Sequence, residues 1–484
     1  MKHLVISLLL CICFIANAQP FRFIVAADGS GTHTTIQAAL DACPESERSL
    51  VFIKNGTYNE QVTLGTKTVT STKKISLIGE SATGVIITHS QSRASSGSPT
   101  YEDICTVKTY ANDFYAENIT IQNTAGNTGM AEALYTAGDR QTFKNCRILG
   151  YQDTYRSKKG TRGYFKNCWI EGAVDFIYAG GILFFDDCTI NCVNGGGYIV
   201  APEDAAYTIP KASTVCQKFI RVGFFFRNCN ITANADVAAN SYYLGRPWNV
   251  TAGTYYLNCK LGNHIKAAGW QTMGGNETTA SFAEYNSMDA SGTPVDVTGR
   301  ISWSFQLPKA DVDNLMTTTG IYGLVTTATY EPISLCIAAS APASITVVDK
   351  NISWPAVDGA VGYVLLKDGK YLASVSELTF TDNSGISGTY SVKSVGALGL
   401  MSGATSSSTA IVEVKDSELH ATVANGMISL TKQATISIYS TSGEKVATEF
   451  NCISLPINNL AKGIYFLKMI ESNGHFATQK IIIH

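Results

Sequence analysis

The sequence predicts an all-β protein, a parallel β-helix followed by two small β-sandwich domains. Charged residues make up only 15% of the 484 residues, while Gly, Tyr and Phe are plentiful and Pro is scarce, and this balance favours β-structure. A short unit built on an aromatic residue and a cysteine recurs five times between residues 143 and 261, which indicates a solenoid of stacked coils. After residue 350, short apolar runs alternate with turn residues, as in small β-sandwiches.

The N-terminus has the order of a secretory signal peptide. A positively charged start precedes an apolar run from Leu4 to Ile15 and the small residues Ala16-Asn17-Ala18. The run is too short to anchor the chain across a bilayer. A buried strand fits this pattern less well, as does a lipoprotein cysteine at Cys11, which a bulky leucine precedes. We therefore expect a signal peptide over residues 1–18 and a mature chain that works outside the cytoplasm.

Charge and cysteine content exclude some classes of protein. The formal net charge of -2 provides no basic field, so we expect no nucleic-acid partner. Two of the 13 cysteines leave with the signal peptide, and the remaining eleven are an odd number, which argues against a complete disulfide framework. We expect the protein to be a monomer.

The five repeat units share the pattern aromatic-x-Asn/Asp-Cys-x-aliphatic. They are Phe143-Lys-Asn-Cys146-Arg-Ile, Phe165-Lys-Asn-Cys168-Trp-Ile, Phe185-Asp-Asp-Cys188-Thr-Ile, Phe226-Arg-Asn-Cys229-Asn-Ile and Tyr256-Leu-Asn-Cys259-Lys-Leu. Successive cysteines are 22, 20, 41 and 30 residues apart, which fits one unit per coil with loops of variable length. We expect the aromatic, cysteine and aliphatic side chains to form inward ladders, and the Asn or Asp to adopt turn conformations. The cysteines are then core residues rather than metal ligands.

The β-helix is predicted to occupy residues 19–330. Near its start, residues 34–43 place Ile36, Ala39 and Leu40 at helical spacing, so we expect a helix that caps the open end of the solenoid. Small residues and proline at 331–343 indicate a linker.

Two small domains are predicted after the linker. Residues 331–412 contain ISWPAVDGAVGYVLLKDG, which resembles a fibronectin type III module. Residues 413–484 contain IYSTSGEKV, INNLAKGIYFLKM and a basic-aliphatic end, which resemble the C-terminal sorting domain of type IX secretion cargo. That resemblance implies the type IX secretion machinery as a partner and export across the outer membrane. The alternative is a second β-sandwich without a sorting role.

A carboxylate pair is the strongest chemical feature of the solenoid. Asp175 interrupts the mostly apolar run GAVDFIYAG, and burying an ionised carboxylate without partners is very costly. Asp153 lies 22 residues earlier, the spacing of Cys146 and Cys168, so both carboxylates should occupy equivalent positions on adjacent coils. Two close carboxylates cannot both ionise freely, so one suits a general acid and the other a nucleophile.

Three further side chains fit the same chemistry. Gln152 offers an amide donor for an oxyanion, Arg246 can hold a carboxylate by two hydrogen bonds, and Trp248 offers a flat face for a sugar ring. The alternative roles are turn capping for Asp153 and Asp175, a coil hydrogen bond for Gln152, a structural ion pair for Arg246 and packing beneath a loop for Trp248. A serine or zinc hydrolase is disfavoured, because the chain has no G-x-S-x-G motif and its seven histidines form no ligand cluster.

Ordered motifs across about 300 residues resemble the pectin methylesterases. They are Gly56-Thr-Tyr-Asn-Glu60, Gly150-Tyr-Gln-Asp-Thr154, Gly172-Ala-Val-Asp-Phe-Ile177 and Leu244-Gly-Arg-Pro-Trp248, flanked by Ala27-Asp-Gly-Ser-Gly31 and Gly299-Arg-Ile-Ser-Trp303. The resemblance implies a right-handed parallel β-helix, in agreement with the repeats, and it implies no metal and no cofactor.

The resemblance also implies roles for individual residues. Asp175 corresponds to the nucleophile that attacks the methyl-ester carbonyl, and Asp153 to the general acid and base. Gln152 corresponds to the oxyanion donor and Arg246 to the residue that orients Asp175. The implied substrate-binding residues are Trp248, Tyr178, Tyr155 and Met130.

The chain departs from the family pattern at several of these positions. Met130-Ala-Glu-Ala-Leu134 stands where the family usually has Gln-Ala-Val-Ala-Leu, so Met130 replaces a glutamine of the oxyanion hole. Tyr155-Arg156 stands where Leu-Tyr is usual, and Ala179-Gly180 where Gly-Asn is usual. Losing an oxyanion donor costs about 100-fold or more in turnover unless another group replaces it. The departures therefore concern efficiency and substrate preference more than reaction type.

Together these observations predict a secreted or cell-surface carbohydrate esterase that removes methyl groups from homogalacturonan, leaving pectate and methanol. One alternative is a non-catalytic pectin-binding surface protein with a decayed site. A β-helix lyase or polygalacturonase fits less well, because a lyase needs a calcium-binding carboxylate cluster and a hydrolase of glycosidic bonds needs a different carboxylate geometry.

Overall fold

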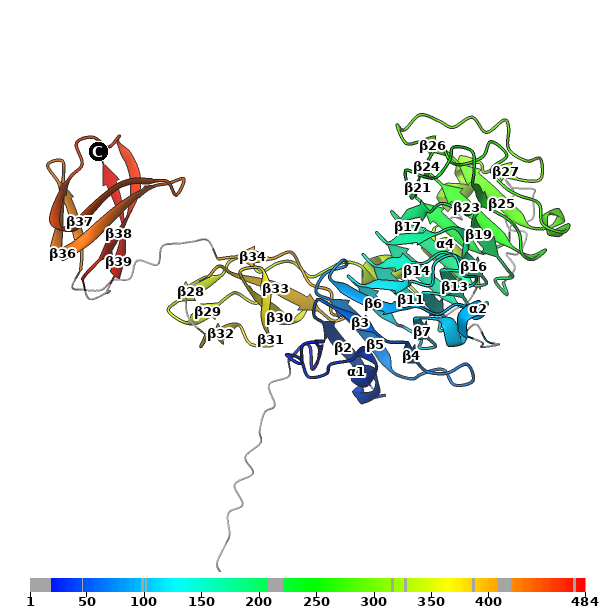
Figure 1. The fold of residues 1–484 in the computed structure, drawn as a ribbon, viewed down its shortest axis with the longest axis horizontal. Helices are drawn as coiled ribbons and strands as arrows, with labels where there is room; N and C mark the ends of the chain where they lie inside the picture. Colours follow the sequence, from blue (N-terminus) through cyan, green and yellow to red (C-terminus); the bar gives the residue numbers. More distant parts are fainter. Residues whose placement is uncertain are drawn as a thin grey trace, which may run out of the picture.

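The first part of the chain is a parallel β-helix, as predicted (Figure 1). The computed structural model describes residues 19–45, 47–96, 100, 102–207, 221–314, 317–325, 329–384, 388–407, 419–472 and 476–483. Within these residues, three parallel sheets run along the solenoid, and each coil from β2 to β22 contributes one strand to each sheet, while the coils at the two ends contribute fewer. The predicted signal peptide, residues 1–18, lies outside the described residues.

The sheets are named here by their number of strands. The eleven-stranded sheet contains, in spatial order, β1 (Phe23–Val25), β2 (Arg48–Ile53), β5 (Lys74–Gly79), β8 (Tyr115–Glu117), β11 (Gln141–Lys144), β14 (Arg162–Lys166), β17 (Ile182–Asp186), β20 (Phe224–Arg227), β23 (Gly253–Leu257), β25 (Ser281–Tyr285) and β27 (Phe305–Gln306). The nine-stranded sheet contains β26 (Met288–Asp289), β24 (Lys260–Leu261), β21 (Asn230–Ala233), β18 (Thr189–Cys192), β15 (Trp169–Gly172), β12 (Arg147–Leu149), β9 (Thr120–Asn123), β6 (Val85–His89) and β3 (Gly56–Asn59). The seven-stranded sheet contains β22 (Tyr243–Gly245), β19 (Tyr198–Pro202), β16 (Val174–Ala179), β13 (Tyr155–Ser157), β10 (Leu134–Thr136), β7 (Val107–Thr109) and β4 (Val62–Leu64).

Short helices accompany the solenoid. They are α1 (Ile36–Ala42), α2 (Arg93–Ser96), η1 (Glu102–Ile104), η2 (Asn276–Thr278), α3 (Lys309–Asn314), α4 (Thr318–Val325) and α5 (Pro332–Leu335). In the described part of the chain, none of the helices is long and apolar enough to cross a membrane.

Helix α1 is the predicted cap of the first coil. Thr35 is its N-cap and accepts a hydrogen bond from the Ala38 backbone, and Ile36 and Leu40 are buried in the core of the solenoid. The Glu60 carboxylate also accepts hydrogen bonds from the first backbone N–H groups of the helix, over 2.8 and 3.0 Å. The Gly56–Glu60 motif therefore stabilises the end of the solenoid and lies apart from the carboxylate pair.

The predicted inward ladders run through the core. The aromatic residues of the five repeat units stack in series, with ring centroids 4.8, 4.9, 4.6 and 4.5 Å apart. The five repeat cysteines are also buried. Each buried Phe contributes about 1.5–3 kcal/mol of transfer free energy, so the ladder is a major source of stability. The Asn or Asp of each unit has a positive φ of 51° to 53°, which confirms the predicted turn conformation.

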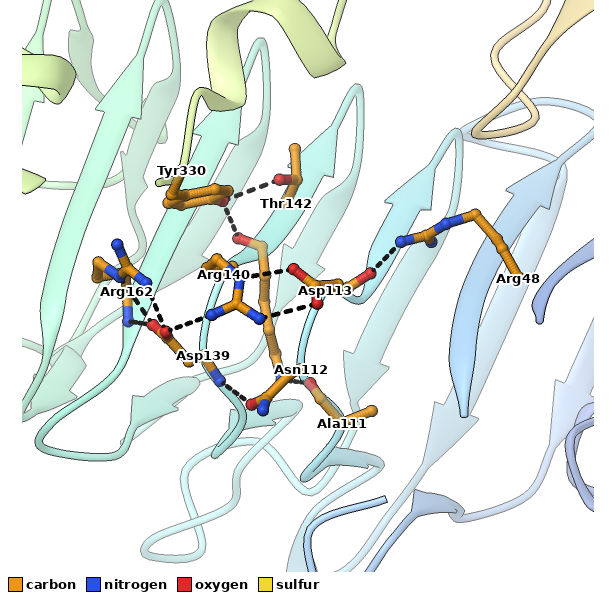
Figure 2. Close-up of polar contacts among 10 residues, drawn as sticks. Arg48, Ala111, Asn112, Asp113, Asp139, Arg140, Thr142, Arg162 and Tyr330 are labelled. Carbon is orange, nitrogen blue, oxygen red and sulfur yellow. Dashed lines mark hydrogen bonds and ion pairs between the residues drawn. The ribbon is translucent and has the colours of Figure 1, made fainter. Parts of the chain in front are cut away.

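A series of ion pairs between aspartate and arginine side chains connects three successive coils (Figure 2). Arg140 donates to both carboxylate oxygens of Asp113, over 2.6 and 2.8 Å, and also to Asp139. Asp139 in turn accepts from the buried Arg162 over 2.6 Å. The Tyr330 hydroxyl donates to the Gln141 carbonyl over 2.9 Å, which ties the segment after α4 to the eleven-stranded sheet. These charges are paired with one another and therefore hold the fold together.

Residues after the solenoid form the predicted β-sandwich. One sheet contains β28 (Thr346–Val348), β29 (Asn351–Ser353) and β32 (Thr379–Thr381), and the other contains β31 (Lys370–Val375), β30 (Ala360–Lys367), β33 (Tyr390–Gly396) and β34 (Thr405–Ser406). The sheets are antiparallel and enclose a core that includes Trp354 and Tyr363. The resemblance to fibronectin type III stays an interpretation.

The sandwich packs against the first coils of the β-helix (Figure 1). Phe52 of β2 stacks on Tyr371 of β31 at 4.9 Å between ring centroids, and Val364 and Leu400 belong to the same buried cluster. Leu335 at the end of α5 packs against a cluster on the eleven-stranded sheet, so part of the expected linker lies on the solenoid. The boundary between residues 330 and 331 stays a prediction.

The last part of the chain is an antiparallel sheet around its own core. Its strands are β35 (Ala421–Ala424), β36 (Met427–Ser440), β37 (Lys445–Pro456), β38 (Gly463–Ile470) and β39 (Phe476–Ile483). Strand β36 pairs with β35 through its first residues and with β38 through its last, while β37 lies along its other edge. The single sheet therefore surrounds a cluster that includes Ile436, Leu467 and Ile481. The predicted boundary between residues 412 and 413 lies outside the described residues.

Candidate active site

The predicted carboxylate pair lies at the start of two neighbouring strands of the seven-stranded sheet. Gln152 forms isolated bridges to Met130 on the preceding coil and to Val174 on the following coil. The Asp153 N–H donates to the Val174 carbonyl over 3.1 Å, so Asp153 and Asp175 occupy equivalent positions on adjacent coils. This placement confirms the juxtaposition predicted from the 22-residue spacing.

Both aspartates occupy unusual backbone positions. Asp153 has a φ of 60° and Asp175 a φ of 47°, in the left-handed region that Asp tolerates better than most residues. The pairing of β16 with β19 shifts register between Val174 and Ile177, as in a β-bulge, and bulges often redirect side chains next to active sites. The apolar run GAVDFIYAG supplies this rigid frame, with Phe176 and Ile177 fully buried around Asp175.

Arg246 holds the Asp175 carboxylate. Its Nε and Nη2 donate to Oδ1 and Oδ2 of Asp175 over 3.1 and 2.6 Å. The guanidinium also lies over the Tyr198 ring, 3.9 Å from the centroid. A bidentate ion pair of this kind fixes the orientation of the carboxylate.

The electrostatic environment of Asp153 differs from that of Asp175 and favours the neutral carboxyl. Asp153 is only 4% exposed, and its pKa is raised to about 8. Burial is the largest cause, the negative charges of Asp175 and Glu132 act in the same direction, and Arg156 and Arg246 oppose the shift. At neutral pH Asp153 is therefore mostly protonated and able to donate a proton, next to a carboxylate that Arg246 pairs.

Comparisons with known proteins place this geometry in a family. A family model described as Pectinesterase matches residues 22–321. The chain belongs to the pectinesterase family. A second model, described as a secretion system C-terminal sorting domain, matches residues 423–484 of this pectinesterase.

Relatives and solved structures agree with this assignment. The pectinesterase chain is 36% identical over 270 residues to a probable pectinesterase A of Neosartorya fischeri, covering 54% of this chain and 77% of the relative. It is 33% identical over 290 residues to a probable pectinesterase/pectinesterase inhibitor of Brassica napus, covering 58% of this chain but only 47% of the relative, so it spans about half the length of that protein. The structure of pectin methylesterase from carrot superposes with a TM-score of 0.55 at 30% identity, covering 63% of this chain and 93% of the carrot protein.

One predicted substrate residue of this pectinesterase does not face the site. Tyr155 is fully buried, pairs in register with the buried Ile177, packs its ring against Phe165 and shares a hydrogen bond with Thr136. Its assignment to substrate binding is wrong, because side chains alternate along the strand and Tyr155 points into the solenoid. Its neighbour Arg156 occupies the outward position that the sequence interpretation gave to Tyr155.

Tyr178 and Trp248 lie together on the outer side of the sheet. Their rings meet edge to face with centroids 5.9 Å apart and an interplanar angle of 72°. Trp248 is 38% exposed and Tyr178 is buried, so the indole offers an accessible apolar surface beside the carboxylates. Met130 and Gln152 are both partly exposed and adjacent to each other, at the register position next to Asp153. Met130, Gln152 and Trp248 are therefore exposed or partly exposed groups beside a nearly buried pair of carboxyls.

The sequence interpretation missed Glu132 as a site residue. Glu132 is fully buried, accepts a short hydrogen bond from the Tyr178 hydroxyl and forms an ion pair with Arg156 over 3.6 Å. In the sequence, both charged residues stand out only as departures from the family pattern. Arg156 pairs in register with Tyr178, but Glu132 lies before the first residue of β10, so no spacing in the sequence pointed to their contact.

Proposed function

We propose that this pectinesterase hydrolyses the methyl esters of homogalacturonan to pectate and methanol through Asp175 as nucleophile. The observation that carries the proposal is that the two adjacent carboxyls have different surroundings. Asp175 is paired with Arg246, whereas burial and neighbouring negative charge raise the pKa of Asp153 to about 8. One carboxylate is thereby fit to attack and one carboxyl to donate a proton.

The reaction follows from these two states. An oxygen of Asp175 attacks the ester carbonyl carbon, and the bond to the methoxy group breaks while Asp153 donates the proton that makes methanol. The product is an anhydride between Asp175 and the galacturonate. Asp153, now a carboxylate, takes a proton from water, and the resulting hydroxide attacks the anhydride, which releases the free acid and restores Asp175.

The remaining residues support this chemistry. The Gln152 amide donates to the oxyanion, and its position beside Asp153, bridged to Met130 and Val174 on the adjacent coils, supports this role. Arg246 orients Asp175, and Trp248 with Tyr178 forms the apolar surface on which a galacturonate ring stacks. Met130 contributes contact but no hydrogen bond of the kind an oxyanion needs.

Methanol release from highly methylated pectin by the full chain tests the proposal. We expect release by the wild type and none by Asp175→Asn, because the amide keeps the shape but lacks the nucleophilic oxygen. A matched control is Asp187→Asn, since Asp187 also has a positive φ and asparagine occupies the equivalent turn position in other coils. Activity in Asp175→Asn, or its loss in Asp187→Asn, would contradict the assignment.

A pectin-binding measurement separates the proposal from a non-catalytic role. Wild-type protein that is folded and binds pectin, yet releases no methanol, would favour a binding protein in which Met130 marks a lost oxyanion donor. Shortening of the polymer without demethylation would favour a lyase or polygalacturonase instead.

We further propose export in two stages for a monomeric protein. The N-terminal residues 1–18 direct the chain out of the cytoplasm, and the sorting domain that matches residues 423–484 hands it to the type IX machinery. Deleting residues 417–484 should stop delivery to the surface or medium while leaving methanol release intact in the cell extract. Normal delivery of the truncated chain would contradict this route.

A further inference from the structure

A second ion pair, between the buried Glu132 and the partly buried Arg156, lies beside the proposed catalytic carboxyls, because the residues on either side of Glu132 donate backbone hydrogen bonds to the residues on either side of Asp153. Glu132 precedes β10 and is fully buried, and Arg156 of β13 reaches it from the next coil over 3.6 Å. The Tyr178 hydroxyl of β16, on the coil after that, donates to the same carboxylate. Three successive coils therefore meet at Glu132.

The outer row of the seven-stranded sheet fixes the geometry of this cluster. Tyr135, Arg156 and Tyr178 are register partners on β10, β13 and β16. The Arg156 guanidinium lies over the Tyr135 ring, 4.5 Å from its centroid, while the Tyr178 ring meets Trp248 edge to face. Glu132 thus connects to the exposed indole through Tyr178, and Arg156 is held between an aromatic face and a carboxylate.

We propose that Glu132 and Arg156 are positioning residues of the esterase site: Glu132 holds Tyr178 against Trp248, and the two charges together control the field at the Asp153 carboxyl. The proposal rests on the catalytic role of Asp153 given above. It assigns a function to two charged residues that the sequence pattern of the family does not contain.

The balance of charge explains the effect on Asp153. The charged groups with the largest effect on this carboxyl are Asp175 of β16, Glu132, Arg156 of β13 and Arg246 after β22, and Tyr178 also faces it. Arg246 forms an ion pair with Asp175, and Arg156 forms one with Glu132. Two of the three neighbouring carboxyls are therefore paired with a guanidinium group. Asp153 is the third, and the protonated form avoids an unbalanced buried charge.

The two charges should act on Asp153 in opposite directions. Glu132→Gln keeps an acceptor for the Tyr178 hydroxyl but removes a negative charge and releases Arg156, and both changes favour the ionised form of Asp153. Arg156→Gln removes a positive charge and favours the protonated form. We expect the titration of Asp153 to move by about one pH unit, downward in Glu132→Gln and upward in Arg156→Gln. The double variant should titrate close to the wild type, because the two charges cancel.

The experiment follows the Asp153 carboxyl directly by 13C NMR of the full chain labelled in aspartate, with the resonance assigned by its loss in Asp153→Asn. The alkaline limb of kcat/KM for methanol release should move in the same directions. A purely structural role would lower stability or kcat without moving either midpoint. An Asp153 midpoint that stays unchanged in both single variants would overturn the inference.

Two further readouts complete the test. Tyr178→Phe removes only the hydroxyl bond to Glu132, so KM for pectin should rise several-fold more than kcat falls, and an unchanged KM would contradict the positioning of Trp248. If the wild type releases no methanol, the proposed function fails, while the NMR titration still decides whether Glu132 and Arg156 control Asp153.

Discussion

The Arg246 guanidinium donates to both carboxylate oxygens of Asp175, over 3.1 and 2.6 Å, although 71 residues separate the two along the chain. The contact forms because β22 pairs with β19 and β19 with β16, which brings the residue after β22 over the bulge of β16. The orientation of the proposed nucleophile therefore depends on a remote coil.

Arg246→Lys should nearly abolish methanol release. A lysine supplies one point of charge where the arginine supplies two aligned donors and a planar face for Tyr198, so Asp175 would be free to rotate. We expect kcat to fall about 100-fold or more, with a smaller change in KM, since misplacing a reacting group costs that much. Steady-state kinetics on pectin checks this, and a lysine variant with near wild-type kcat would contradict it.

Asp153→Asn should yield an inactive but more stable protein. The folded state raises the pKa of Asp153 from 3.8 to about 8, so between these pH values the folded chain holds a proton that the unfolded chain has lost. The free energy of unfolding then falls as pH rises through this window, by up to about 1.4 kcal/mol per pH unit. The amide removes this cost and fits the positive φ of the site.

Thermal unfolding at pH 5 and pH 8 measures this effect. The increase in Tm of Asp153→Asn over the wild type should be larger at pH 8 than at pH 5. For the same reason, wild-type kcat/KM should decline above about pH 8, where Asp153 loses its proton. A difference in Tm that does not depend on pH would contradict the raised pKa.

The sequence predicted the carboxylate pair because neighbouring coils in that part of the solenoid have nearly equal numbers of residues. The 22-residue spacing of Asp153 and Asp175 matches that of two repeat cysteines, so equal coil lengths forced the two carboxyls together. Arg246 follows longer loop insertions, where spacing carries no register, so its chemistry and the resemblance to the family pointed to it but the spacing did not. Stacking in a solenoid is predictable where loops are short.

Side-chain direction was harder to predict. Asp153 has a positive φ, which interrupts the regular alternation of side chains between the two faces of the sheet. In the strand that follows, Tyr155 faces inward and Arg156 outward. Glu132 and Arg156 could not be paired from the sequence, because charged residues are usually solvated and nothing in the spacing required them to meet. Buried ion pairs of this kind become visible only once the coils are stacked.

Met130→Gln should increase turnover. Met130 lies beside Gln152 on the preceding coil, so an amide there would provide a second donor for the oxyanion. One such donor is worth about 100-fold in kcat where no other group replaces it, and we expect a gain of at least several-fold. Kinetics of Met130→Gln and of Met130→Leu, which keeps the volume without a donor, gives the comparison. Equal kcat in both variants would show that another group already serves the oxyanion.

Gly172→Ala should damage both stability and activity. A Cβ at residue 172 would lie 2.2 Å from the Phe176 Cβ and 2.8 Å from the Thr154 hydroxyl, and neither the core nor the adjacent coil has room to move. Overpacking of this kind costs about 1–3 kcal/mol, and the shift would be transmitted to Asp175 next to Phe176. Gly323→Ala in α4 is the matched control, because a Cβ there meets nothing within 4 Å and alanine favours a helix. Urea unfolding and methanol release of both variants check the prediction, and a Gly172→Ala protein as stable and active as the wild type would show that the frame around Asp175 can yield.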